Sequence, residues 1–266
     1  PVGRIAVYAA SGATQIVHEF NLSEGATATN AGTDYFGKGT ISGTYTIASS
    51  GTSYLGYSSE HTDDVGYTIA ATGKIVNDGR LSLGGTVANA GVISGNGTLT
   101  LLKGTDGTFT NTGSIQSGTL IADNVTYTQT AGTLAADAGW FTNSVINQTG
   151  GTITSAALGS GNTYNLGADG STDTAQYNLT RLTSDSTVNI RQGATLHADA
   201  IAMTGNKTTH LLGGTLATTL DQIFNDVSHQ AHDIDATGPN DRVDVAGPDI
   251  VTGVGTVIDS VAKGIE

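Results

Sequence analysis

Two histidines near the C-terminal end have the spacing that comes closest to a metal site. His229 and His232 lie three residues apart, a separation at which two side chains on one face of a helix can share a zinc ion. A zinc protease would instead show the sequence His-Glu-x-x-His on a helix. We therefore interpret the pair as part of a polar helix face.

Aspartates supply a second kind of metal chemistry, because calcium prefers oxygen ligands. The densest group consists of Asp233, Asp235, Asp241 and Asp244, and Asp169 with Asp173 forms a weaker one. Neither group has the spacing of an EF-hand loop or of the calcium-binding nonapeptide. We interpret these carboxylates as solvated turn residues and expect no metal or other cofactor.

The chain also lacks the patterns expected of an enzyme. A Gly-x-Ser-x-Gly nucleophile turn is absent from the sequence. Glycan cleavage needs carboxylates that converge on one groove, yet Asp106, Asp123 and Asp137 do not follow the repeat described below. We expect no catalysis. Glycan binding stays open as an alternative, because Trp140 and the nine tyrosines are able to stack on sugar rings.

An internal repeat in the sequence indicates which secondary-structure elements would position these candidate residues. Short segments in which a glycine is followed by an aliphatic residue recur on average about every 20 residues. Examples are Gly91-Val92-Ile93 and Gly113-Ser114-Ile115. The whole series of glycines is Gly73, Gly91, Gly113, Gly132, Gly151, Gly170, Gly193 and Gly214.

Alternating stretches between these glycines, such as Thr98-Leu99-Thr100-Leu101, have the pattern of short strands with one buried face. A unit of this length cannot bury its apolar face alone, but stacked copies can. The repeat predicts a right-handed parallel β-helix. A leucine-rich repeat or a β-propeller would need signatures that are missing, whereas an antiparallel sandwich stays possible without explaining the constant period.

The ends of the chain differ from its middle. We expect coils over residues 1–216, regular in 67–216 and less regular in 1–66. The polar segment 58–64 predicts a protruding loop, and its Ser59, Glu60, Asp63 and Asp64 are our candidate partner contacts. Apolar residues at 220, 223, 224, 227 and 231 predict a helix over 219–233, inside a non-repeating cap of residues 217–266.

Composition limits the partners. Only 12% of the residues are charged, and the net charge is −13. Such a chain is repelled by phosphate backbones and anionic lipids, so we expect no nucleic-acid partner and no insertion into a membrane.

Cysteine is absent, and no apolar run approaches the ~20 residues of a membrane-spanning helix. The first residues do not resemble a signal peptide.

The repeats of residues 89–101 and 109–120 resemble those in the passenger domains of Gram-negative autotransporter adhesins, of the diffuse-adherence (AIDA-like) and self-associating type. The stretch 235–245 is similar to a late strand of such passengers. The resemblance implies type V secretion to the cell surface and anchoring in the outer membrane by a β-barrel outside this chain. Two-partner-secreted haemagglutinins have similar coils.

The resemblance implies an adhesin that drives cell–cell aggregation and biofilm formation, or attachment to host cells and extracellular-matrix proteins. Its partners would be copies of itself, matrix proteins or surface glycans. Two alternatives remain: a glycan-binding or glycan-cleaving β-helix of the polysaccharide-lyase or phage-tailspike kind, and a stalk that binds nothing.

Overall fold

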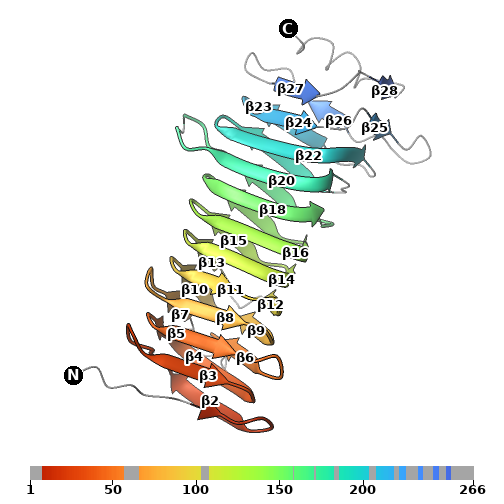
Figure 1. The fold of residues 1–266 in the computed structure, drawn as a ribbon. Helices are drawn as coiled ribbons and strands as arrows, with labels where there is room; N and C mark the ends of the chain where they lie inside the picture. The colour runs from red at the N-terminus through yellow and green to blue at the C-terminus, as the bar shows by residue number, and fades with distance from the viewer. Residues whose placement is uncertain are drawn as a thin grey trace. The chain divides into compact units, whose positions relative to one another are not determined.

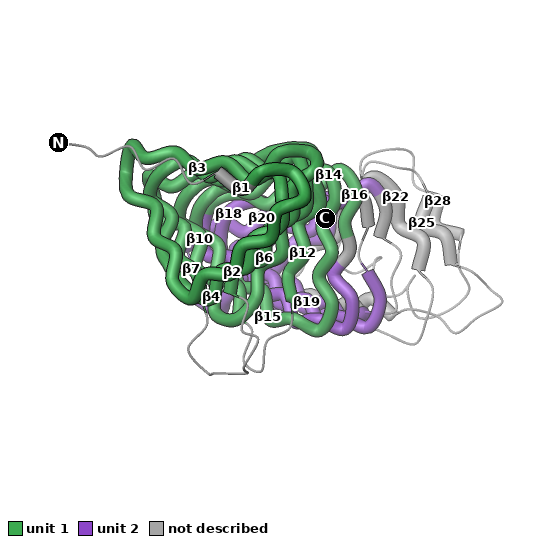
Figure 2. The backbone as a smooth tube through the Cα atoms, turned by 90° about the horizontal axis from the view of Figure 1, so that it is seen from below, with its two compact units in different colours: residues 1–128, 132–139 green, residues 129–131, 140–266 purple. Residues whose placement is uncertain are grey.

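The protein is an all-β parallel β-solenoid, a β-helix of about nine turns with about 19 residues per turn. The structure, a computed structural model, describes residues 8–56, 66–102, 108–157, 159–170, 172–182, 186–203, 208–218, 222–225, 233–235, 242–245 and 250–252. Within these residues no helix is long and apolar enough to cross a membrane. The chain divides into two compact units, residues 1–128 with 132–139, and residues 129–131 with 140–266 (Figure 2).

In the first unit, the strands of successive coils lie in three stacks of parallel strands (Figure 1). The first stack contains β1 (Tyr8–Ala9), β3 (Thr27–Asn30), β5 (Thr44–Ile47), β8 (Lys74–Asn77), β11 (Val92–Ser94) and the start of β14 (Ser114–Asp123). The second contains β2 (Thr14–Glu19), the start of β4 (Thr33–Ile41), β6 (Thr52–Leu55), β9 (Arg80–Leu83), β12 (Thr98–Leu101) and the end of β14. The third contains the end of β4, β7 (Gly66–Ile69), β10 (Thr86–Asn89) and β13 (Thr108–Asn111).

The second unit has the same plan. Its strands are β17 (Val145–Gln148), β18 (Gly151–Ala157), β19 (Thr163–Leu166), β20 (Ala175–Leu182), β21 (Thr187–Arg191), β22 (Ala194–Met203), β23 (Thr208–Leu212) and β24 (Thr215–Thr218). Four shorter strands follow: β25 (Gln222–Asn225), β26 (Asp233–Asp235), β27 (Arg242–Val245) and β28 (Ile250–Thr252). Two further strands, β15 (Thr126–Gln129) and β16 (Thr133–Thr142), have residues in both units.

The predicted repeat matches the register of the coils. Ile75 pairs with Ile93, and Ile93 pairs with Ile115. All three side chains are buried in the core, and the residue on either side of each points outward, as a strand requires. Gly170 does not follow this register. It lies in a turn with φ 72°, and the coil continues instead through Tyr177, which pairs with Ile153 on one side and Leu196 on the other.

The prediction of a helix over 219–233 is wrong where the structure describes that segment, and residues 219–221 and 226–232 lie outside the described residues. Gln222–Asn225 forms strand β25, and Asp233–Asp235 forms strand β26. Ile223 pairs with Ile201 of β22, so long-range pairing with the preceding coil decides the conformation here, and the local apolar stripe does not. Strands β25 to β28 pair with earlier coils, so parallel pairing continues beyond Leu216. The separate cap of 217–266 stays a prediction.

Candidate functional site

The candidate partner contacts Ser59, Glu60, Asp63 and Asp64 lie outside the described residues, as does the rest of the predicted 58–64 loop. The histidine pair, His229 and His232, and the carboxylate of Asp241 lie outside them too. These predictions are therefore untested by the structure.

The remaining aspartates of the C-terminal patch lie on different stacks of strands. Asp233 and Asp235 are in β26, which pairs with β23, and Asp244 is in β27, which pairs with β24. Asp169 forms an ion pair with Arg191, with 3.2 Å between its Oδ2 and the Arg191 Nη1. In the part of the chain that the structure describes, no three His, Asp or Glu residues are grouped to hold a metal.

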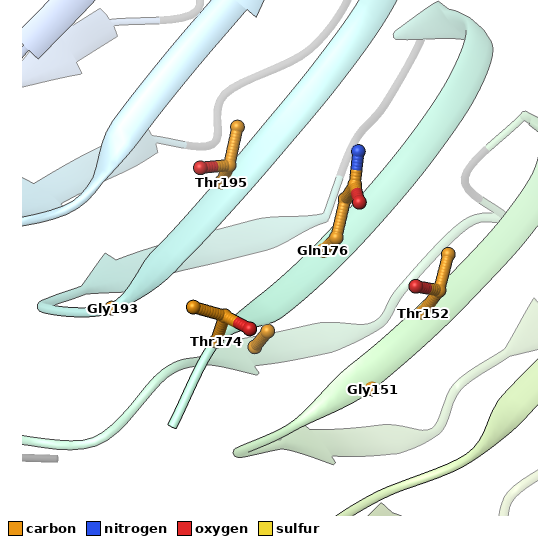
Figure 3. Close-up of a pocket in the computed structure, with 7 residues that line it drawn as sticks. Gly151, Thr152, Thr174, Gln176, Gly193 and Thr195 are labelled. Carbon is orange, nitrogen blue, oxygen red and sulfur yellow. The ribbon is translucent and has the colours of Figure 1, made fainter. Parts of the chain in front are cut away.

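A shallow pocket lies on the second unit (Figure 3). Its volume is about 370 Å³, at the small end of the range of ligand pockets. It lies at the beginnings of β18, β20 and β22. We call it the threonine–glutamine pocket; its lining residues are Gly151, Thr152, Thr174, Ala175, Gln176, Gly193 and Thr195.

The register of the coils brings the polar side chains of this pocket together. Thr152 pairs with Gln176, and Gln176 pairs with Thr195, on three adjacent strands. Figure 3 shows the three side chains projecting from the same face of the sheet. Neighbouring strands are about 4.8 Å apart, so the row offers hydrogen-bonding groups at that interval. The sequence shows the individual residues but not this row, because the coils that hold them differ in length.

A second polar row runs along the partly buried face of β17, β19 and β21. Asn189 donates from Nδ2 to Oδ1 of Asn165 at 2.9 Å, and Asn165 donates in the same way to Asn147 at 2.9 Å. The three amides therefore hold one another in fixed orientations. They form a preorganised strip of amide groups at the edge of solvent.

The aromatic residues mostly serve the core. Five tyrosines are fully buried and unable to stack on a sugar: Tyr45, Tyr67, Tyr127, Tyr164 and Tyr177. Tyr35 and Tyr54 stack on each other with ring centroids 4.7 Å apart, and the side chain of Trp140 lies outside the described part. The five buried tyrosines thus give no support to the sugar-stacking alternative, which Trp140 leaves untested.

One titratable cluster is buried inside the first unit. The Tyr45 hydroxyl donates to Oδ2 of Asp34 at 2.6 Å and lies 2.8 Å from Oγ of Ser53. Asn30 donates from Nδ2 to the same Oγ at 2.8 Å. Oδ1 of Asp34 is buried without a hydrogen-bond partner. Burial raises the pKa of Asp34, and the hydrogen bond from Tyr45 opposes this only in part. The cluster is enclosed, so we assign it to stability and not to ligand binding.

The substitution Asp34→Asn removes the ionisable group, so the stability of the variant relative to wild type should increase as the pH rises. When folding raises the pKa of a carboxyl group, that group contributes its full stabilisation at pH values below the pKa it has in the unfolded chain. That contribution is lost as the pH rises through the folded pKa. The difference in unfolding free energy between variant and wild type should therefore grow from about pH 4 upward, measured by urea denaturation. A difference that is constant with pH would show that Asp34 titrates normally.

No known family model matches the chain, and comparison with curated proteins and with solved structures likewise finds no match.

Proposed function

We propose that this chain is part of the passenger domain of a bacterial cell-surface adhesin. It would be exported by type V secretion and held at the outer membrane by a β-barrel outside this chain. Its partners would be copies of itself on neighbouring cells, or matrix proteins and glycans of a host. The proposal assigns no catalysis to the chain.

The observation that carries the proposal is the set of outward polar rows in register on successive coils. Thr33 pairs with Thr52, Thr98 with Thr119, and the amides of Asn147, Asn165 and Asn189 are linked by hydrogen bonds. Each hydrogen bond to a partner contributes only ~0.5–1.5 kcal/mol net. A repeated row makes several such contacts, and many copies on one cell add avidity.

Two observations bear on the alternatives. A glycan-cleaving site needs a pair of carboxylates, and none of the residues that line the threonine–glutamine pocket has a carboxylate. This favours binding over cleavage at that place. A stalk without a partner would need no pocket, so the threonine–glutamine pocket favours an adhesive role.

The proposal is tested by displaying the chain on a bacterial strain that neither aggregates nor adheres. We expect displaying cells to settle faster than cells carrying the anchor alone, or to be retained on surfaces coated with matrix proteins or host cells. A matched control displays the chain with Thr152, Gln176, Asn165 and Asn189 changed to alanine, and should show weaker adhesion. Displaying cells that stay dispersed and wash off every surface would refute the adhesin.

A further inference from the structure

We propose that the threonine–glutamine pocket binds an uncharged saccharide, so that the ligand of the chain is a neutral glycan. The inference names the ligand class of the proposed adhesin and rests on that function. It is carried by four properties of the pocket: its paired backbone, its lack of charge, its available amide and its small residues.

The backbone at the pocket is already paired, which disfavours an extended peptide. Strand β20 pairs with β18 on one side and β22 on the other, and β22 also pairs with β24. Peptides that recognise sheets do so by adding a strand to a free edge, and no edge is free at these strands. A ligand here must therefore be recognised by side chains.

The charge of the pocket disfavours an ionic ligand. Its lining contains no Lys, Arg, His, Asp or Glu. A sulfated or sialylated sugar would therefore meet no positive charge in the pocket, and a cation would meet no negative charge. The net charge of −13 adds long-range repulsion of anions. The lining also has no aromatic or large aliphatic side chain, so a lipid or an apolar ligand would bury little surface.

The polar groups suit a ligand rich in hydroxyls. Threonine hydroxyls both donate and accept hydrogen bonds, and the amide of Gln176 does the same through two atoms. Gln176 is exposed, and its side chain makes no hydrogen bond to any residue that the structure describes. Sugar hydroxyls also donate and accept at once, so they match this set without leaving a donor or acceptor unpaired.

Small residues leave room for a ring. Gly151 and Gly193 have φ of 72° and 78°, the left-handed region in which other residues are strained. Neither has a side chain that would fill the hollow. Ala175, between them at the start of β20, is buried and ends at Cβ. The threonine and glutamine side chains of the pocket therefore lie next to small residues.

The test is calorimetric titration of the full chain with a fixed probe set: lactose, maltotriose, mannotriose, and 3′-sialyllactose as the charged counterpart of lactose. We expect one of the neutral probes to bind and 3′-sialyllactose to bind at least about tenfold more weakly. Gln176→Ala and Thr195→Val should each weaken binding about threefold to tenfold. Asn178→Ala and Thr154→Val, on the same strands but outside the pocket, should leave it unchanged.

Failure of this inference and failure of the proposed function give different results. If no neutral probe binds, if 3′-sialyllactose binds as tightly as the neutral probe that binds best, or if Gln176→Ala binds like wild type, the saccharide pocket is wrong. If cells displaying Gln176→Ala still aggregate like wild type, the adhesin stands without the pocket. If the titration succeeds but displaying cells do not adhere, the pocket stands and the adhesin is wrong.

Discussion

Replacing Gly113 with alanine is expected to lower the unfolding free energy by about 3 kcal/mol or more. A Cβ at this position would lie 2.1 Å from the backbone oxygen of Gly91 in the preceding coil. That oxygen accepts a hydrogen bond from the backbone nitrogen of Ser114 at 2.9 Å, so the two coils cannot separate without losing the ladder. Urea or thermal denaturation of the two proteins measures the loss.

Gly12→Ala provides the control for this prediction. Nothing lies within 4 Å of the added Cβ at Gly12, but its φ is 81°. The control therefore measures only the loss of unfolding free energy that comes from placing an alanine in the left-handed backbone region, which is about 1–2 kcal/mol. Gly113 has no positive φ, so its cost comes from the close approach of two coils. A Gly113→Ala protein as stable as wild type would mean that the coils are stacked differently.

The second large effect is expected at Asn111, whose amide lies inside the first unit. Asn89 donates from Nδ2 to Oδ1 of Asn111 at 2.8 Å, and the backbone nitrogen of Gly113 donates to the same oxygen at 3.2 Å. Asn111 itself donates from Nδ2 to the backbone oxygen of Thr133 at 3.2 Å. Asn111→Leu keeps the branched shape of the side chain but leaves Nδ2 of Asn89 buried without an acceptor, a loss of about 1–3 kcal/mol. The backbone nitrogen of Gly113 keeps a second acceptor, the backbone oxygen of Asn89 at 3.1 Å.

Thr110→Val is the matched control for Asn111→Leu, because Thr110 is exposed on the same strand. It should change the unfolding free energy by no more than about 0.5 kcal/mol. The two variants are compared by the midpoint of urea denaturation. Equal midpoints for Asn111→Leu and Thr110→Val would contradict the internal hydrogen bonds and the register that they imply.

The repeat was readable because it is local in each coil. A glycine two residues before an inward aliphatic residue, as in Gly73 and Ile75 or Gly91 and Ile93, is visible without any knowledge of pairing. The close approach of Gly91 to the backbone oxygen of Gly73 supplies its physical reason. The sequence thus predicts a β-helix and the core positions that the structure stacks in register.

Features that depend on pairing between coils were not predictable in the same way. Apolar residues such as Ile223 and Phe224 fit a helical stripe, yet pairing with Ile201 and Ala202 places them in a strand. The threonine–glutamine pocket needs Thr152, Gln176 and Thr195 in one row, although the first pair is separated by 24 residues and the second by 19. Coils of unequal length hide such rows from a fixed period.

The most direct test of adhesion uses beads coated with the purified chain, because no other surface component is then present. We expect coated beads to cluster with one another, or to bind beads that carry matrix proteins or neutral glycans. Beads coated with Gly113→Ala, under conditions where that variant is unfolded, should do neither. Wild-type beads that stay dispersed in every mixture, or that bind no better than the unfolded variant, would contradict the adhesive function.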